Sequence, residues 1–99
     1  MKVEKLTEKA FMAQVTQMAT WFGWRVYHTY DSRRSSAGFP DLVLVHPGRG
    51  LIFAELKVGR GKLTPEQQAW LDDLQAANIR ACCWWPEDWK YIEFVLRGE

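Results

Sequence analysis

The sequence has little net charge, few cysteines and no long apolar run, and each shortage excludes a class of protein. Its 99 residues carry a formal net charge of only +1, so overall charge does not indicate a nucleic-acid partner. Any DNA contact must therefore come from local basic patches. No apolar run is long enough to span a bilayer, and the charged N-terminal stretch lacks the apolar core of a signal peptide. We therefore expect an intracellular protein.

The two cysteines, Cys82 and Cys83, are adjacent. Neighbours in a strand point to opposite faces, so they are poor partners for a disulfide, and their spacing does not match a zinc site. We interpret them as small apolar strand residues that are buried.

Tryptophan, by contrast, is abundant, with six in the chain. Hydrophobic residues make up 47% and charged residues 25%, an ordinary globular balance, and the length suits one domain with one core. Tryptophan is enriched at protein interfaces as well as in cores. Both a compact monomer and an oligomer stay open, and we favour the oligomer.

Apolar periodicity predicts four elements in the first part of the chain. They are a helix over residues 7–22 capped by Thr7, and strands over 24–29, 41–45 and 51–57. The strand over 41–45 is apolar on both faces, which indicates a central position in a covered sheet. The turn HPGRG joins it to the next strand as a β-hairpin.

A second helix begins at Thr64, because Thr64 and Gln67 form a capping box around Pro65 at the first helical position. Its predicted buried face is Trp70, Leu71, Leu74 and Ala77. A strand over 79–85 and a last helix from Pro86 to about Leu96 follow. This order indicates an α/β fold with a mixed central sheet flanked by helices.

Three ionisable residues lie on the core hairpin. Asp41 begins one strand, and Glu55 and Lys57 share a face of the next because they are two residues apart. Such a group costs free energy unless it is paired or binds a metal. Two carboxylates suit Mg²⁺, and the amine could orient an attacking water or offset developing charge. The alternative is a plain surface salt bridge.

The register of the hairpin is open at this stage. A turn centred near Gly48 or Arg49 places Asp41 opposite residue 55, 56 or 57. A four-residue turn pairs Asp41 with Leu56 and aims it at the wrong face, whereas a three-residue loop or a bulge near Pro40 restores the match.

Two further polar residues are expected to point inward. Glu8 lies beside the apolar stripe of the first helix, although the helix dipole also favours a carboxylate in a first turn. Gln67 lies on the apolar face of the second long helix, where capping and a role in the site are compatible.

Taken together, these motifs resemble a known family. The runs Ser32-Arg33-Arg34, Gly38-Phe39-Pro40-Asp41, Ala54-Glu55-Leu56-Lys57 and Gly61-Lys62-Leu63-Thr64-Pro65-Glu66-Gln67 look like the VRR-NUC group of the PD-(D/E)XK nuclease superfamily. The resemblance covers about residues 7–90. It implies a restriction-endonuclease-like fold with an α-β-β-β-α-β core and a C-terminal helix, in a single nuclease domain over residues 1–99.

The resemblance also implies roles for single residues. Asp41 and Glu55 would hold Mg²⁺ or Mn²⁺ with the backbone carbonyl of Leu56, and Lys57 would position or activate the water. Glu8 corresponds to the family's acidic residue of the first helix, a further metal ligand. Gln67 corresponds to its helix glutamine and joins Asp41, Glu55 and Lys57 in the catalytic group.

Basic and hydroxyl residues flank this site in the sequence. We expect phosphate contacts from Ser32, Arg33, Arg34, Arg60 and Lys62, with solvated loop charge as the alternative.

The expected function is therefore metal-dependent hydrolysis of DNA phosphodiester bonds. Compact relatives resemble phage or prophage enzymes and are similar to homodimeric Holliday-junction resolvases, which implies branched DNA as substrate, a homodimer, and the cytoplasm of a bacterial host or phage-infected cell. The alternatives are a non-catalytic branched-DNA-binding module, a flap or duplex nuclease of the same fold, and a structural dimerisation domain.

Overall fold

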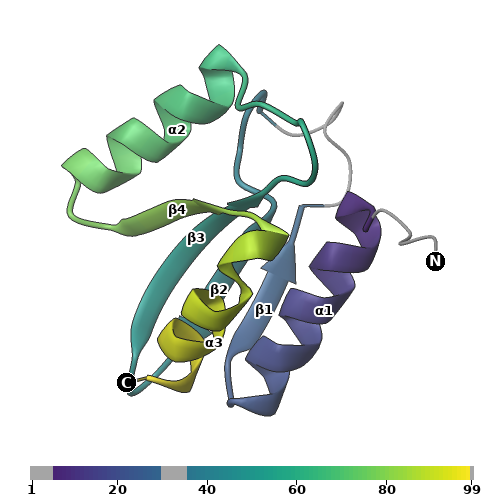
Figure 1. The fold of residues 1–99 in the computed structure, drawn as a ribbon. Coiled ribbons are helices and arrows are strands. Elements are labelled where there is room, and N and C mark those ends of the chain that lie inside the picture. The colour runs from purple at the N-terminus through teal and green to yellow at the C-terminus, as the bar shows by residue number, and fades with distance from the viewer. Residues whose placement is uncertain (1–5, 30–35, 99) are drawn as a thin grey trace, which may run out of the picture.

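The computed structural model describes residues 6–29 and 36–98. Its elements follow the predicted order (Figure 1). They are α1 (Glu8–Trp21), β1 (Arg25–His28), β2 (Leu42–His46), β3 (Gly50–Leu56), α2 (Pro65–Ala76), β4 (Arg80–Trp84), the 3₁₀ turn η1 (Pro86–Asp88) and α3 (Trp89–Arg97). No helix of this described part combines the length and apolar character needed to cross a bilayer.

Two of the three predicted helix starts, those capped by Thr7 and Thr64, are confirmed. The Thr7 hydroxyl accepts a hydrogen bond from the Ala10 amide at 3.0 Å, which caps α1. At α2 the Gln67 amide donates to Thr64 Oγ1 at 3.1 Å, and the Thr64 amide donates to Gln67 Oε1 at 2.9 Å. This reciprocal pair is the predicted capping box, and it fixes the orientation of the Gln67 side chain.

Three details of the predicted elements are corrected. Ala77 is exposed, because it is the C-cap of α2 and lies beyond the last packed turn. The last helix does not begin at Pro86, because a 3₁₀ turn comes first. At this turn the Trp85 amide donates a hydrogen bond to the Asp88 carboxylate at 2.9 Å. Cys82 and Cys83 are free but only half-buried, and burial raises the pKa of their thiols to about 12 and about 11.

The four strands form one mixed sheet in the order β1-β2-β3-β4. The first two pairings are antiparallel and the β3–β4 pairing is parallel, as α2 provides the crossover. In the β2–β3 hairpin Leu42 pairs with Ala54 and His46 with Gly50. The loop therefore holds three residues, and the same register carried one step further places Asp41 opposite Glu55.

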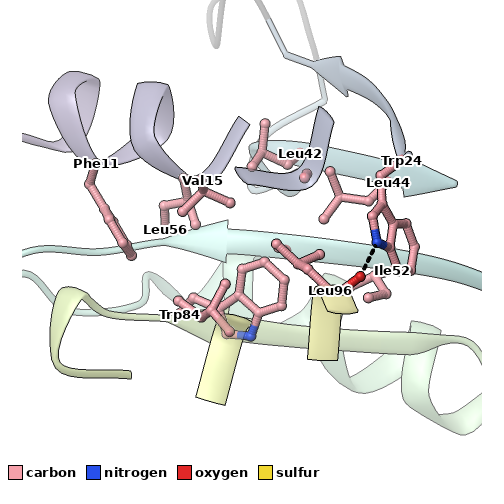
Figure 2. Close-up of a cluster of buried hydrophobic side chains, with 12 residues drawn as sticks. Phe11, Val15, Trp24, Leu42, Leu44, Ile52, Leu56, Trp84 and Leu96 are labelled. Atoms are coloured by element: carbon pink, nitrogen blue, oxygen red, sulfur yellow. Dashed lines mark hydrogen bonds between the residues drawn. The ribbon is translucent and has the colours of Figure 1, made fainter. Parts of the chain in front are cut away.

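The core lies between the sheet and the helices α1 and α3 (Figures 1 and 2). Fully buried side chains from α1, β2, β3 and α3 meet there, among them Phe11, Leu42, Ile52 and Leu96. The Trp24 indole donates to the carbonyl of Leu96 at 2.7 Å, which ties the chain after α1 to the end of α3.

The other sheet face is covered only in part. The helix α2 packs against β4 on this side, and its Gln67 reaches Glu55 at the end of β3. Over β1 and β2, however, Tyr27 and Val45 remain 61% and 39% exposed. The prediction that β2 is an inner strand of the sheet is confirmed. The prediction that both of its faces are covered is only half right, because helices cover β2 on the face toward α1 and α3 but leave Val45 exposed on the other.

Candidate active site

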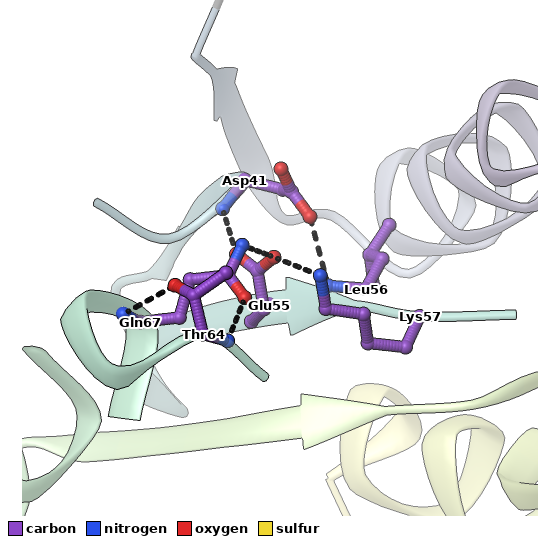
Figure 3. Close-up of polar contacts among 6 residues, drawn as sticks. All are labelled: Asp41, Glu55, Leu56, Lys57, Thr64 and Gln67. Carbon is purple, nitrogen blue, oxygen red and sulfur yellow. Dashed lines mark hydrogen bonds and ion pairs between the residues drawn. The ribbon is translucent and has the colours of Figure 1, made fainter. Parts of the chain in front are cut away.

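Asp41 and Glu55 face each other where β2 begins and β3 ends (Figure 3). The Asp41 amide donates to Glu55 Oε1 at 3.2 Å, and the Leu56 amide donates to Asp41 Oδ2 at 2.9 Å. Each carboxylate is therefore bound to the backbone of the opposite strand. The sequence predicted that these two groups would meet if the loop held three residues, and the structure brings them together.

Lys57 completes the predicted trio. Its Nζ lies 3.6 Å from Glu55 Oε2, and only 9% of the residue is exposed. The Lys57 amide donates to the carbonyl of Trp84 at 3.0 Å, so the backbone position is held by β4. An amine that is this deeply buried beside a carboxylate is not the plain surface salt bridge that the sequence left as an alternative.

The Glu55 carboxyl is buried, and its pKa is raised. It is 2% exposed, and burial together with the nearby Asp41 charge raises its pKa from 4.5 to about 7, against the opposite influence of Lys57. A buried carboxylate whose charge is poorly compensated is a group that a divalent cation would stabilise.

Gln67 connects the site to α2. Its Nε2 donates to Glu55 Oε2 at 2.9 Å, while its Oε1 accepts from the Thr64 amide. The capping box thus orients the side chain that holds the carboxylate. Capping and contact with the site occur in the same residue, as the sequence allowed.

The structure does not bring every predicted residue into this group. Glu8 is exposed on the first turn of α1 rather than pointing inward, because a side chain at the helix start can remain in solvent while it interacts with the free amides. Arg60 and Lys62 are exposed in the connection between β3 and α2. Ser32, Arg33 and Arg34 lie outside the described residues.

Sequence reasoning missed one part of the site. It assigned Trp70 to the core-facing side of α2, but the Trp70 indole donates to the carbonyl of Ala37 at 3.1 Å, in the turn before Asp41. The sequence carried a signal in Gly38, since glycine permits both the positive φ that the structure gives this residue and a close approach of the backbone to another element.

The family model of the VRR-NUC domain matches residues 2–83. The chain belongs to the VRR-NUC family. The predicted restriction-endonuclease-like fold of the PD-(D/E)XK superfamily is thereby confirmed, and with it the membership of a nuclease family.

Two solved structures share the fold of this VRR-NUC chain. One described as a VRR-NUC domain has a TM-score of 0.72 at 20% identity, covering 90% of this chain and 92% of its own. A second, a VRR-NUC domain protein, has a TM-score of 0.66 at 19% identity, covering 96% and 89%. The Holliday junction resolvase of Archaeoglobus fulgidus is more distant, with a TM-score of 0.49, 18% identity, and 80% and 65% covered. No curated protein matches.

The donor atoms of this VRR-NUC site fit a hard divalent cation. Asp41 and Glu55 offer carboxylate oxygens, and Mg²⁺ takes one or two protein carboxylates while it keeps several waters. Within residues 6–29 and 36–98 no group of three or more histidine, cysteine, aspartate or glutamate residues could hold a metal. With two carboxylates, such an ion would keep waters in its remaining ligand positions.

Proposed function

We propose that this chain is a divalent-metal-dependent endonuclease that hydrolyses DNA phosphodiester bonds, within a single domain over residues 1–99. The observation that supports the proposal best is the meeting of Asp41, Glu55 and Lys57 where β2 begins and β3 ends. Two carboxylates and one amine at the open end of an otherwise apolar hairpin, with Glu55 and Lys57 buried, are costly to keep unless they perform chemistry.

In this proposal Asp41 and Glu55 hold Mg²⁺ or Mn²⁺, with the Leu56 carbonyl as a third ligand. A bound ion of this kind polarises a phosphate oxygen and lowers the pKa of a bound water. Lys57 orients that water and offsets the charge that develops on the phosphate. Gln67 acts on Glu55, because its amide holds the Oε2 atom in place. Glu8, exposed on the first turn of α1, is proposed as a further ligand of that ion.

We further propose that the substrate is branched DNA, such as a four-way junction, cut in the cytoplasm of a bacterial or phage-infected cell. Arg60 and Lys62, which are exposed between Lys57 and α2, would contact phosphates near the cut. Ser32, Arg33 and Arg34 precede Asp41 in the sequence and are proposed to contact the same backbone. Such contacts position a duplex without reading its bases.

The proposed activity is tested with purified protein on a four-way junction, a flap, a duplex and single-stranded DNA. We expect strand cleavage with Mg²⁺ or Mn²⁺, none in EDTA, and none with Asp41→Asn, which removes a charged ligand at almost constant shape. The folded state of the variant is checked by circular dichroism. Binding of the junction without nicks would favour the non-catalytic module, and preference for a flap or duplex would replace the proposed substrate.

A homodimer would suit symmetric cutting of a junction, since a two-fold assembly presents two equivalent sites. We propose that it forms through the uncovered sheet face. Cross-strand pairing places Tyr27 beside Val43 and Val43 beside Phe53 on this face, with Val45 beside Leu51. An apolar sheet surface of this kind favours a self-complementary contact, because every copy presents the same patch.

Light scattering after size-exclusion chromatography measures the mass of the protein in solution and so tests for the dimer. We expect wild-type protein at twice the chain mass and Val45→Lys at the monomer mass, because a lysine charge added to the exposed part of this face would be desolvated on association. Trp21→Ser, an exposed position on α1, is the matched control and should stay dimeric. A wild-type monomer at concentrations where the junction is cut would contradict this part of the proposal.

A further inference from the structure

The turn before Asp41 is fastened to α2 by one tryptophan. Trp70 donates its indole N–H to the carbonyl of Ala37 at 3.1 Å. The ring of Phe39 packs edge-on against the same indole, with centroids 5.0 Å apart and an interplanar angle of 81°. The Phe39 ring also packs edge-on against Phe53 of β3, with the ring centroids 6.1 Å apart. The turn is therefore held between the helix and the sheet.

Gly38 lies at the point of closest approach. Its φ is +83°, and a Cβ built there would come within 2.4 Å of the Glu66 carbonyl carbon and 2.6 Å of the Gln67 amide nitrogen. Both atoms belong to the backbone of the first turn of α2, which cannot move aside as a flexible side chain can. The turn thus rests directly on the residue that holds Glu55.

This contact joins the supports of the two carboxylates. On one side the turn continues through buried Pro40 into Asp41. The Pro40 carbonyl accepts a hydrogen bond from the Thr29 hydroxyl at 2.9 Å. On the other side the same turn of α2 carries Gln67, whose amide donates to Glu55. A shift between the turn and α2 would therefore change the distance between Asp41 and Glu55.

We propose that Trp70 is a positioning residue of the metal site: together with Gly38 it locks the 36–40 turn onto α2. This contact acts with the direct hydrogen bonds that join Asp41 to Glu55 and to Leu56 to fix the separation of the two carboxylates. This inference rests on the proposed function. Trp70 touches neither carboxylate in the contacts described, and it acts through Ala37 and Phe39 on one side and through the helix that carries Gln67 on the other. Supporting residues of this kind strongly affect metal affinity.

The test uses Mn²⁺ binding to the whole chain without DNA, followed by calorimetry or by the electron paramagnetic resonance of free Mn²⁺. Trp70→Ala removes the hydrogen bond and the ring, Trp70→Phe removes the hydrogen bond alone, and Gly38→Ala disturbs the same contact from the other side. Trp24→Phe is the matched control, because it also removes an indole hydrogen bond to a backbone carbonyl, that of Leu96, at the far end of the sheet.

We expect Trp70→Ala and Gly38→Ala to weaken Mn²⁺ binding by on the order of tenfold, and Trp70→Phe by a smaller factor. The apparent Mn²⁺ requirement of cleavage should rise in step, while the rate at saturating Mn²⁺ falls less. Trp24→Phe should lower the Tm but leave Mn²⁺ affinity within about twofold of wild type. If Trp70→Ala does not fold, Trp70→Phe and Gly38→Ala decide the matter.

Two results would overturn the inference while the proposed function stands. One is unchanged Mn²⁺ affinity in folded Trp70→Phe and Gly38→Ala, and the other is an equal loss in Trp24→Phe, which would show a general effect of stability. A wild-type chain that neither binds Mn²⁺ nor cuts DNA is a distinct failure, since it removes the proposed function and the inference together.

Discussion

Replacing Lys57 with methionine is expected to lower the rate of DNA cleavage by on the order of 10²- to 10³-fold. Methionine keeps most of the buried stem, so the packing beside β4 changes little, but the charge 3.6 Å from Glu55 is lost. In the proposed mechanism that charge orients the attacking water and stabilises the transition state. Single-turnover cleavage at saturating Mn²⁺ measures the effect without a contribution from product release.

Lys90→Met is the control for this substitution, because Lys90 is an exposed lysine on α3. It should cut at the wild-type rate. Circular dichroism and urea unfolding should show Lys57→Met folded at the temperature of the assay. A folded Lys57→Met that cuts as fast as the control would remove Lys57 from the proposed catalytic group and leave the two carboxylates to explain the reaction.

The metal-free protein is expected to lose stability as the pH rises from about 4.5 to about 7. Folding raises the pKa of the Glu55 carboxyl from 4.5 to about 7, mainly through burial and the Asp41 charge. The folded chain therefore holds this proton more tightly than the unfolded chain. Its contribution to the free energy of unfolding is complete below pH 4.5 and is lost as the pH passes through about 7, a change on the order of 3 kcal/mol.

Urea unfolding followed by tryptophan fluorescence, in EDTA at pH 5 and pH 8, measures this change. Other groups titrate over the same interval, so the informative quantity is the difference between wild type and Glu55→Gln, whose amide does not titrate. The free energy of unfolding should fall less in the variant than in wild type between pH 5 and pH 8. Mn²⁺ added at pH 8 should raise the free energy of unfolding of wild type more than that of the variant. Equal falls in both proteins would contradict the raised pKa.

Much of this site could be predicted from the sequence, because the relevant signals are local. The spacing of Glu55 and Lys57 placed both on one face of a strand, and the capping box of Thr64 and Gln67 located the start of α2. The apolar character around Asp41 and Glu55 made their charge conspicuous. These patterns depend on residues a few positions apart, for which chain geometry alone is decisive.

The remaining features depended on contacts between distant segments. The HPGRG turn permits three or four loop residues, and only packing of Leu42 and Leu44 into the core selects the register that sets Asp41 opposite Glu55. Glu8 has the same helical phase whether its side chain turns inward or into solvent. The Ala37–Trp70 hydrogen bond joins residues 33 positions apart, for which no periodicity exists.

The hydrogen bond from the Leu56 amide to the Asp41 carboxylate has a consequence for how such a site can change. At the last residue of β3, a side chain from the opposite strand binds a backbone amide. The Asp41 carboxylate, which is proposed to bind an ion, thus also accepts a hydrogen bond that holds the end of the hairpin together. Losing the Asp41 side chain would therefore also remove a hydrogen bond that holds the hairpin. We expect an inactive descendant of this chain to keep a carboxylate, or an amide in its place, at position 41 after the nuclease activity is lost.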